Sequence, residues 1–284
     1  MSSSLPLPFR DRQTWHSELL CPEKDLMIHF LIPALVVAVM ATSLMIMIEA
    51  GRRFGIYRKK SDPDTADAGI STVDGAIYGL LGLVIAFTFS GAATRFDHRR
   101  DLVTQEANAI GTAFLRVDLL PPAMQPAIKQ DFRDYLDARL AFYRAIPDDP
   151  EGLRVAQSKY TALQEKIWSE SVAGCKEAGS PATTSLVLSS LNDMIDITTT
   201  RAVAAEMHPP WVIFLALLAL ALTGAFLAGY GTAGAKKRNW AHMFIFAGVM
   251  SLAIYMILDL EFPRLGLIRV NAIDHVLQDT RNTM

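Results

Sequence analysis

The sequence predicts an all-α membrane protein with four transmembrane helices and a helical-bundle domain inserted between the second and the third of them. The chain has 284 residues, of which 51% are hydrophobic. Long apolar runs occur at four places, and amphipathic patterns lie between the second run and the third. Each run has about the 20 apolar residues that a helix needs to cross roughly 30 Å of hydrocarbon. The runs are Leu26–Ile48, Gly75–Ala93, Trp211–Tyr230 and Trp240–Leu258.

The composition of the runs distinguishes them from the buried helices of a soluble protein. Such helices are shorter and carry a charge every few residues on one face, which these runs lack. Trp211, Tyr230 and Trp240 stand at run ends, where amphipathic rings favour the headgroup level of a membrane. A helix also satisfies its own backbone hydrogen bonds in lipid. The runs are therefore expected to be transmembrane helices in contact with the lipid bilayer.

Domain boundaries follow from the positions of the runs. Residues 1–25 form a polar N-terminal tail without the apolar segment of a signal peptide, so the first span is expected to act as the targeting signal. Residues 26–94 hold transmembrane helices 1 and 2, and residues 95–209 form the water-exposed helical domain. Residues 210–259 hold transmembrane helices 3 and 4. Residues 260–284 form a C-terminal tail that could lie as a helix near the membrane surface.

Apolar residues recur with helical spacing throughout the inserted domain. From Phe96 to Val117 they step by threes, fours and sevens, so the second transmembrane helix is expected to continue as one long helix. A further helix ends at the Pro-rich turn 147–150, and another follows it. The stretch 174–184 is rich in Gly, Ser, Thr and Pro and is expected to be a loop before a last helix. These helices predict a four-helix bundle continuous with the membrane helices.

Positive charge is concentrated in the two short connections between spans. Short connections rich in Lys and Arg stay in the cytoplasm, whereas long domains contribute little to orientation. The rule predicts a multi-pass inner-membrane protein with both termini and the inserted domain outside the cytoplasm. Arg95, Arg99 and Arg100 favour the opposite orientation. The charged residues are Arg52, Arg53, Arg58, Lys59 and Lys60 after the first span and Lys236, Lys237 and Arg238 after the third.

Several stretches of the chain resemble a bacterial family called bestrophin-like, whose members are largely of unknown function. The first is Tyr78-Gly-Leu-Leu-Gly-Leu-Val-Ile-Ala-Phe-Thr-Phe-Ser-Gly-Ala-Ala-Thr-Arg-Phe-Asp-His-Arg-Arg100, followed by Glu106-Ala-Asn-Ala-Ile-Gly-Thr-Ala-Phe-Leu-Arg116. The resemblance continues through Asp118-Leu-Leu-Pro and Asp134-Tyr-Leu-Asp-Ala-Arg139 to the third and fourth spans. It therefore covers most of the chain.

The resemblance implies a fold and an activity. True bestrophins are pentameric anion channels whose second helix lines the pore and continues into a soluble helical domain, so a homo-oligomer that passes small anions is implied here. Bestrophins keep that domain in the cytoplasm, which differs from the orientation that the short loops predict. Their Trp-rich signature after the second helix is reduced in this chain to Arg95-Phe-Asp-His-Arg-Arg100.

Small residues form one face of the second span. Gly75, Gly79, Gly82, Ala86 and Ser90 recur at steps of four and three. Such a stripe lets helices approach closely, and it could equally line a pore with small side chains. The sequence leaves both interpretations open.

Charged residues also stand beside the apolar seam of the long helix. Glu106 and Asn108 lie on its extension, and Glu106 is expected to pair with Arg99, Arg100 or Arg139 and fix the register of the bundle. An anion-coordinating arginine cluster is the alternative. Two further carboxylates lie near spans. Asp74 in a Ser-Thr-Val-Asp start pattern and Asp259 after the last apolar run are interpreted as capping and interface residues, with a proton relay as the alternative.

Other kinds of chemistry lack a sequence signal. The six histidines show no pair at metal-ligand spacing, and no phosphate loop or Ser/His/Asp set is visible. Net charge is −2 with no basic cluster interleaved with aromatics. The chain is thus expected to be no enzyme, to use no metal or cofactor and to bind no nucleic acid. Cys21 and Cys175 fall on the predicted outer side, where a disulfide could persist.

Two functions follow from these observations. The first is an oligomeric ion channel, with the second helix lining an anion pathway. The alternative is a non-catalytic membrane sensor or scaffold whose helical domain binds a partner or ligand. Oligomeric state distinguishes them, because four helices of a single chain leave no room for a pore between themselves.

Overall fold

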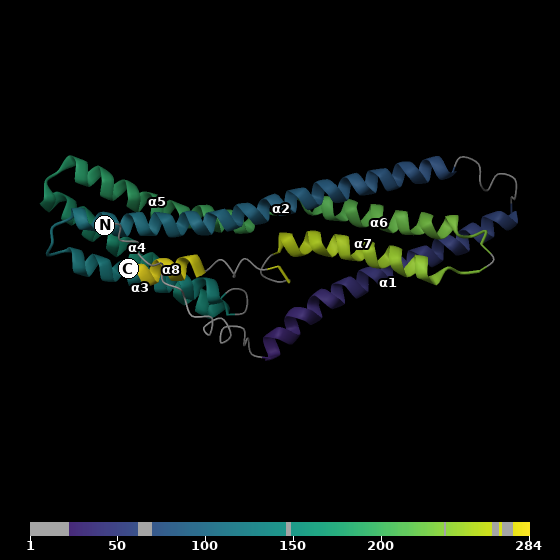
Figure 1. Ribbon diagram of the computed structural model, residues 1–284, viewed down its shortest axis with the longest axis horizontal. Coiled ribbons are helices and arrows are strands. Elements are labelled where there is room, and N and C mark those ends of the chain that lie inside the picture. Colours follow the sequence, from purple (N-terminus) through teal and green to yellow (C-terminus); the bar gives the residue numbers. More distant parts are fainter. Residues whose placement is uncertain (1–22, 62–69, 146–148, 236, 263–266, 269–274) are drawn as a thin grey trace, which may run out of the picture.

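The computed structural model describes residues 23–61, 70–145, 149–235, 237–262, 267–268 and 275–284. Within these ranges every regular element is helical, as expected, and the helices form two bundles placed end to end that share the long helix α2 (Figure 1). The helices are α1 Glu23–Ser61, α2 Ile70–Arg116, the 3₁₀ turn η2 Val117–Leu119, α3 Gln125–Ala145, α4 Pro150–Ala178, α5 Pro181–Glu206, α6 Trp211–Gly231, α7 Trp240–Glu261 and α8 His275–Thr283.

The first bundle, here the membrane bundle, consists of α1, the first half of α2, α6 and α7. The helices of this bundle are long and apolar enough to cross a membrane, which confirms the four predicted spans. α1 packs against α6 and α7, and α2 packs against the same two helices from another side (Figure 1). Buried Leu44, Ile48, Leu81, Leu217 and Ile254 fill the space between them.

Two glycines set how closely α1 and α6 approach. A Cβ added at Gly229 would lie 1.9 Å from the carbonyl oxygen of Ile48, and one added at Gly51 would lie 1.9 Å from that of Phe226. Backbones in such contact exclude any side chain, so glycine is required at both crossings. Close helix packing through small residues therefore occurs here.

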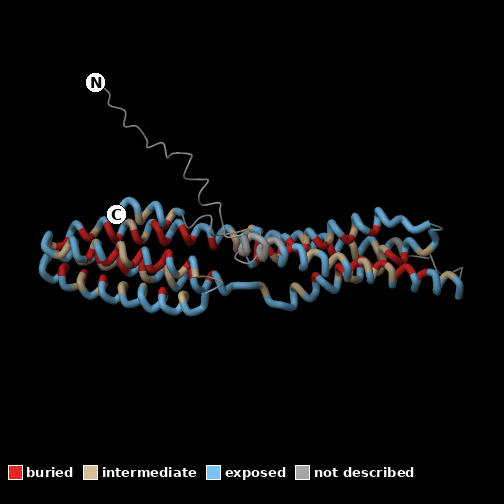
Figure 2. The backbone as a smooth tube through the Cα atoms, turned by 90° about the horizontal axis from the view of Figure 1, so that it is seen from below, coloured by how far each residue is buried: buried red, intermediate tan, exposed pale blue. Residues whose placement is uncertain are grey.

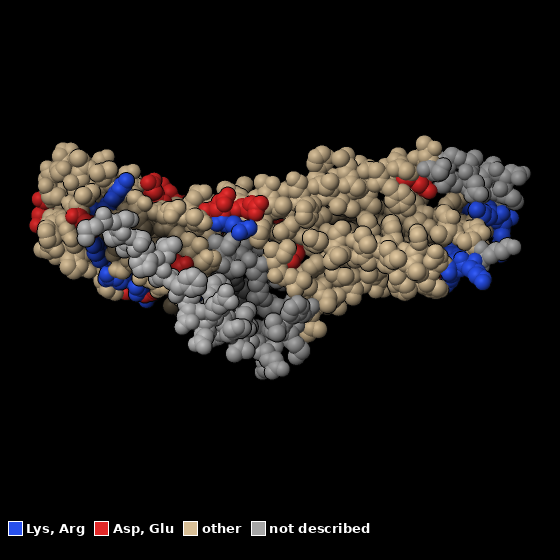
Figure 3. All heavy atoms as spheres, in the orientation of Figure 1, with Lys and Arg blue, Asp and Glu red and all other residues tan. Residues whose placement is uncertain are grey.

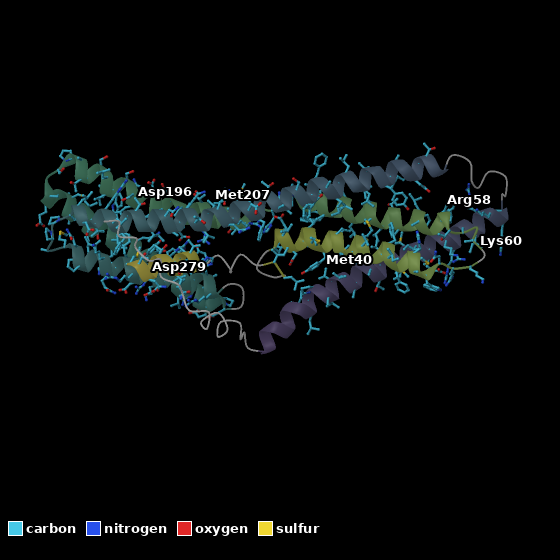
Figure 4. The ribbon with its side chains drawn as sticks, in the orientation of Figure 1. Met40, Arg58, Lys60, Asp196, Met207 and Asp279 are labelled. Atoms are coloured by element: carbon cyan, nitrogen blue, oxygen red, sulfur yellow. The ribbon has the colours of Figure 1, made fainter. Side chains whose placement is uncertain are left out.

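The basic residues that follow the first span lie on a helix and not in a loop. α1 continues to Ser61 and carries Arg58, Lys59 and Lys60 in its last turn. No proline interrupts residues 49–61, and cations at a helix C-terminus interact favourably with the helix dipole. Figure 3 shows Lys and Arg gathered at this end of the membrane bundle, and Figure 4 labels Arg58 and Lys60 there.

The second bundle consists of the second half of α2 together with α3, α4, α5 and α8. Its buried residues form a continuous core that includes Ile110, Phe132, Leu136, Ile167 and Met194 (Figure 2). The apolar spacing of the sequence thus identified the inward faces of these helices.

The predicted loop 174–184 is mostly helical. α4 continues to Ala178, and Gly179 ends it in the left-handed conformation with a φ of 63°. Ser180 then caps α5, since its hydroxyl accepts from the backbone N–H of Thr183 at 3.3 Å, and Pro181 occupies the first turn. The prediction was wrong because Gly, Ser and Pro act here as capping residues of helices. Only Gly179 and Ser180 separate α4 from α5.

The C-terminal helix α8 packs in the second bundle, so the prediction of a helix near the membrane surface was wrong. It contacts α2 and α3. Leu277 is fully buried, and Nε of Arg281 lies 2.9 Å from Oδ1 of Asp137. The surface of α2 and α3 thus covers its apolar side. Cys21 lies outside the described residues, and Cys175 is buried in α4.

Candidate functional site

The small-residue face of α2 points away from the other helices of its own chain. Gly75, Gly79, Gly82, Ala86 and Ser90 are all exposed. A Cβ added at any of the three glycines would meet no atom within 4 Å. Packing against α6 or α7 therefore does not explain this face, which is open to lipid, to a second copy of the chain or to a pathway.

The same face continues along the second half of α2 with different chemistry. At 100° per residue, Asp97, Asp101, Thr104 and Asn108 fall on the line of Gly75 to Ser90, and all four are exposed. Asp97 lies 3.8 Å from Arg100, which is half exposed. The line passes the partly buried Ala93 and changes from small residues in the membrane bundle to acidic and polar ones in the second bundle.

A buried group of charges, the Glu106 cluster, joins three helices of the second bundle. Glu106 of α2 is fully buried, and its Oε1 accepts from Nε of Arg139 of α3 at 2.7 Å. Its Oε2 accepts from Nη1 of Arg201 of α5 and, at 3.1 Å, from the hydroxyl of Tyr143. One carboxylate therefore holds two guanidinium groups, and the cluster has a surplus positive charge.

Aromatic rings surround these guanidinium groups. Cζ of Arg139 lies 4.6 Å from the ring centre of Tyr160, and Cζ of Arg201 lies 4.1 Å from that of Tyr143. Such contacts compensate part of the cost of burying a cation. Burial raises the pKa of the Tyr143 hydroxyl, and the Glu106 carboxylate raises it further. Burial alone would lower the pKa of Arg139, but the charge of Glu106 reverses this and raises it. Arg139 therefore stays charged.

A second buried group, the Glu261 cluster, lies where the two bundles meet. Glu261, at the end of α7, is fully buried; Arg95 Nη2 lies 2.7 Å from its Oε2, and His208 Nδ1 lies 3.0 Å from its Oε1. Arg99 lies within 3.6 Å of the same carboxylate. Figure 4 labels Met207, which lies at this junction.

Arg99 of α2 also binds backbone carbonyl groups at the ends of two other helices, α5 and α7. Its guanidinium group donates to the carbonyl oxygens of Ala204 at 3.0 Å, Met207 at 2.9 Å and Glu261 at 2.9 Å. These carbonyls belong to the ends of α5 and α7, where helices leave carbonyls without partners. Arg99 therefore fixes how the second half of α2 is joined to both bundles.

Asp259, which the sequence placed at the end of the last span, is also a buried residue of the junction. Its carboxylate accepts from the Tyr255 hydroxyl at 3.1 Å and from the backbone N–H groups of Leu267 at 2.8 Å and Ile268 at 3.0 Å. It thereby holds the chain that returns after α7. Asp74 lies within α2, which begins at Ile70, and is partly buried.

The residues proposed for one polar cluster are divided among several places. The structure brings Glu106 and Arg139 together, but Arg99 belongs to the Glu261 cluster. Arg100 and Asn108 are exposed on α2. Sequence reasoning missed Arg201, Tyr143 and Glu261. Only Arg201 gave a visible signal, as a lone charge between uncharged residues at the end of α5. Within the described ranges, no group of three or more His, Cys, Asp and Glu residues could hold a metal ion.

These features define an all-helical membrane protein with a long shared helix. Residues 37–273 match the family described as Bestrophin-like domain. The chain therefore belongs to the bestrophin-like family, as the sequence resemblance indicated. None of the curated protein sequences matches it.

Solved structures of bacterial bestrophin homologues have a similar fold. A crystal structure of a variant from Klebsiella pneumoniae is 15% identical, with a TM-score of 0.62, and the match covers 87% of this chain and 98% of that one. Another crystal structure of a homologue from the same organism is 15% identical, with a TM-score of 0.61 and coverage of 85% and 98%. A crystal structure described as a membrane protein variant is 16% identical, with a TM-score of 0.58. At such identities the likeness extends to the fold alone.

Proposed function

We propose that the chain forms a ring-shaped homo-oligomer in which α2 lies nearest the axis and small ions pass along its exposed face. One observation carries the proposal: on the face of α2 from Gly75 to Asn108, the small residues of the membrane bundle and the polar residues of the second bundle are exposed in a single chain. An ion pathway needs a continuous lining of small or polar side chains, which this face supplies.

The ion pathway must lie between copies of the chain. Large apolar side chains fill the centre of the membrane bundle, including the fully buried Leu44 and Leu217. A cyclic arrangement of identical copies instead surrounds a central axis with one repeated face. Anions are the expected ions on the family resemblance alone, because bestrophins conduct them, whereas the carboxylates of Asp97 and Asp101 on this face favour cations.

The second bundle is the inserted, water-exposed domain in this proposal, and the membrane is the bacterial inner membrane. Charged side chains are spread over the surface of the second bundle, whereas the membrane bundle carries most of its charge at one end (Figure 3). The basic end would face the cytoplasm and the domain the opposite side, because positive short connections stay inside.

The test is ion flux through the purified protein in liposomes, combined with its size in detergent. Gly82→Leu or Ala86→Leu is expected to reduce flux strongly while expression stays normal, since larger side chains narrow a pathway. Gly248→Leu is the matched control, because Gly248 lies on α7 and a Cβ there also meets nothing within 4 Å.

The outcomes separate the two functions. A higher oligomer with flux that falls in the α2 variants and not in Gly248→Leu supports the channel. A monomer or dimer without flux of chloride, sodium or potassium contradicts it and favours the sensor or scaffold. Equal loss of flux in all variants would also contradict the role of the α2 face.

A further inference from the structure

A groove opens between α1 and α7 at the basic end of the membrane bundle. Its volume is about 560 Å³, and the side chains of Met45 and Met243 form part of its apolar wall. Glu49, Arg53, Arg238 and Trp240 line its other part. The groove thus joins an apolar surface to a charged rim.

The rim of the groove carries more positive than negative charge, because it has two arginines and one glutamate. Arg53 Nε donates to Oε1 of Glu49 at 2.8 Å, and Arg238 Nη2 donates to the same oxygen at 2.9 Å. One carboxylate oxygen therefore serves two guanidinium groups, each of which has further N–H donors. Cζ of Arg238 also lies 5.3 Å from the ring centre of Trp240. The rim has a surplus positive charge and N–H groups suited to bidentate contact with phosphate oxygens.

The groove lies at the depth of phospholipid headgroups. The first apolar run ends at Ile48, directly before Glu49, and α7 begins at Trp240, a residue type that favours the headgroup level. α1 and α2 both pack on α6 and α7, but on different sides of this helix pair (Figure 1). If α2 lies nearest the axis, this side of the chain faces lipid.

We propose that the groove binds one anionic phospholipid, whose phosphate contacts Arg53 and Arg238 and whose acyl chain lies along Met45 and Met243. Basic pockets between membrane helices are suited to such headgroups, and the apolar wall adds affinity that a free phosphate ion cannot gain. The surplus charge of the rim matches the single negative charge of a phosphodiester headgroup.

Native mass spectrometry of the full chain in detergent tests the proposal with phosphatidylglycerol and phosphatidylcholine at equal concentration. The wild-type chain is expected to retain phosphatidylglycerol preferentially. Arg53→Gln should reduce that preference about tenfold, the effect of losing one charge-assisted contact. The Arg53 side chain is 78% exposed, so this change leaves the fold intact. Arg58→Gln is the matched control, since it removes the same charge from α1 outside the groove.

The alternatives give different results. Equal loss of preference in Arg53→Gln and Arg58→Gln would mean general attraction to the basic end and would overturn the proposal. Displacement of the lipid by millimolar inorganic phosphate would identify a free-phosphate site and overturn it as well. If Arg53→Gln kept the full preference for phosphatidylglycerol, the groove would be excluded as the lipid-binding site. Each readout is independent of ion flux, so the channel proposal stands or falls separately.

Discussion

Arg139 of α3 donates through Nε to Oε1 of Glu106 of α2 at 2.7 Å, and both side chains are almost completely buried. A buried ion pair gains little over an apolar pair, but removal of one partner leaves an uncompensated charge. Here removal of Glu106 would leave two uncompensated positive charges, because Arg201 pairs with the same carboxylate. The Glu106 cluster therefore fixes how α2, α3 and α5 pack against one another.

Glu106→Gln is expected to destabilise the second bundle by about 3–5 kcal/mol, because two buried guanidinium groups lose the carboxylate that they share. Thermal unfolding of the purified protein in detergent measures the loss. Asn108→Ala is the control on the same helix, and it should change stability by less than about 0.5 kcal/mol because Asn108 is exposed. Equal unfolding temperatures for wild type and Glu106→Gln would contradict this role.

Gly229→Leu is expected to disrupt the membrane bundle, since its Cβ would overlap the Ile48 carbonyl oxygen. Overpacking of this kind costs about 1–3 kcal/mol or more. Gly79→Leu adds the same side chain to the open face of α2 and should leave the monomer fold intact. The yield of folded protein after solubilisation distinguishes the two. A normal yield for Gly229→Leu would mean that α1 and α6 do not cross there.

Arg99→Lys is expected to loosen the junction between the bundles. An ammonium group cannot reach three carbonyl oxygens in the planar geometry that the Arg99 guanidinium group uses. Loss of one or two charge-assisted hydrogen bonds costs about 2–4 kcal/mol. Hydrogen exchange should become faster at the ends of α5 and α7, whereas the core of α3 and α4 stays protected. Unchanged exchange at those ends would exclude this role.

Asp97→Asn combined with Asp101→Asn is expected to raise the ratio of chloride to potassium flux. Both residues are exposed on the face of α2 that is proposed to line the pathway, and a ring of carboxylates attracts cations. Asp193→Asn on α5 removes a charge of the same sign elsewhere and should leave the ratio unchanged. An identical ratio in the double variant and the wild type would place these carboxylates outside the pathway.

Orientation is tested by two cysteine variants in a chain without Cys21 and Cys175. The charge of the short connections predicts that Lys159→Cys, on exposed α4, reacts with a membrane-impermeant maleimide in intact spheroplasts. Lys60→Cys, at the opposite end, should react only after permeabilisation. A reporter enzyme that works only in the periplasm should be active when it is fused after Met284, and a reporter that works only in the cytoplasm should be inactive there. The reverse pattern would give this chain the cytoplasmic domain known in bestrophins.

Much of the fold could be predicted from the sequence because its signals are local. The four spans follow from apolar length, and the continuation of α2 follows from uninterrupted helical spacing between Phe96 and Val117. The turn 174–184 was predicted incorrectly because capping residues have the same composition as a loop. Position alone also suggested that the C-terminal helix lies near the membrane, whereas its apolar side packs on α2 and α3.

The sequence by itself determined the helical class, the number of spans and the family, because hydrophobic length and periodicity are properties of consecutive residues. Only the tertiary structure decided which charges meet. Glu106 pairs with Arg139 and Arg201, which are 33 and 95 residues away, and Glu261 pairs with Arg95 from 166 residues away. It also showed that Gly51 and Gly229 form the close helix contact while Gly75, Gly79 and Gly82 stay open. A small residue has the same local signal in both settings, and only the position of the neighbouring backbone distinguishes them.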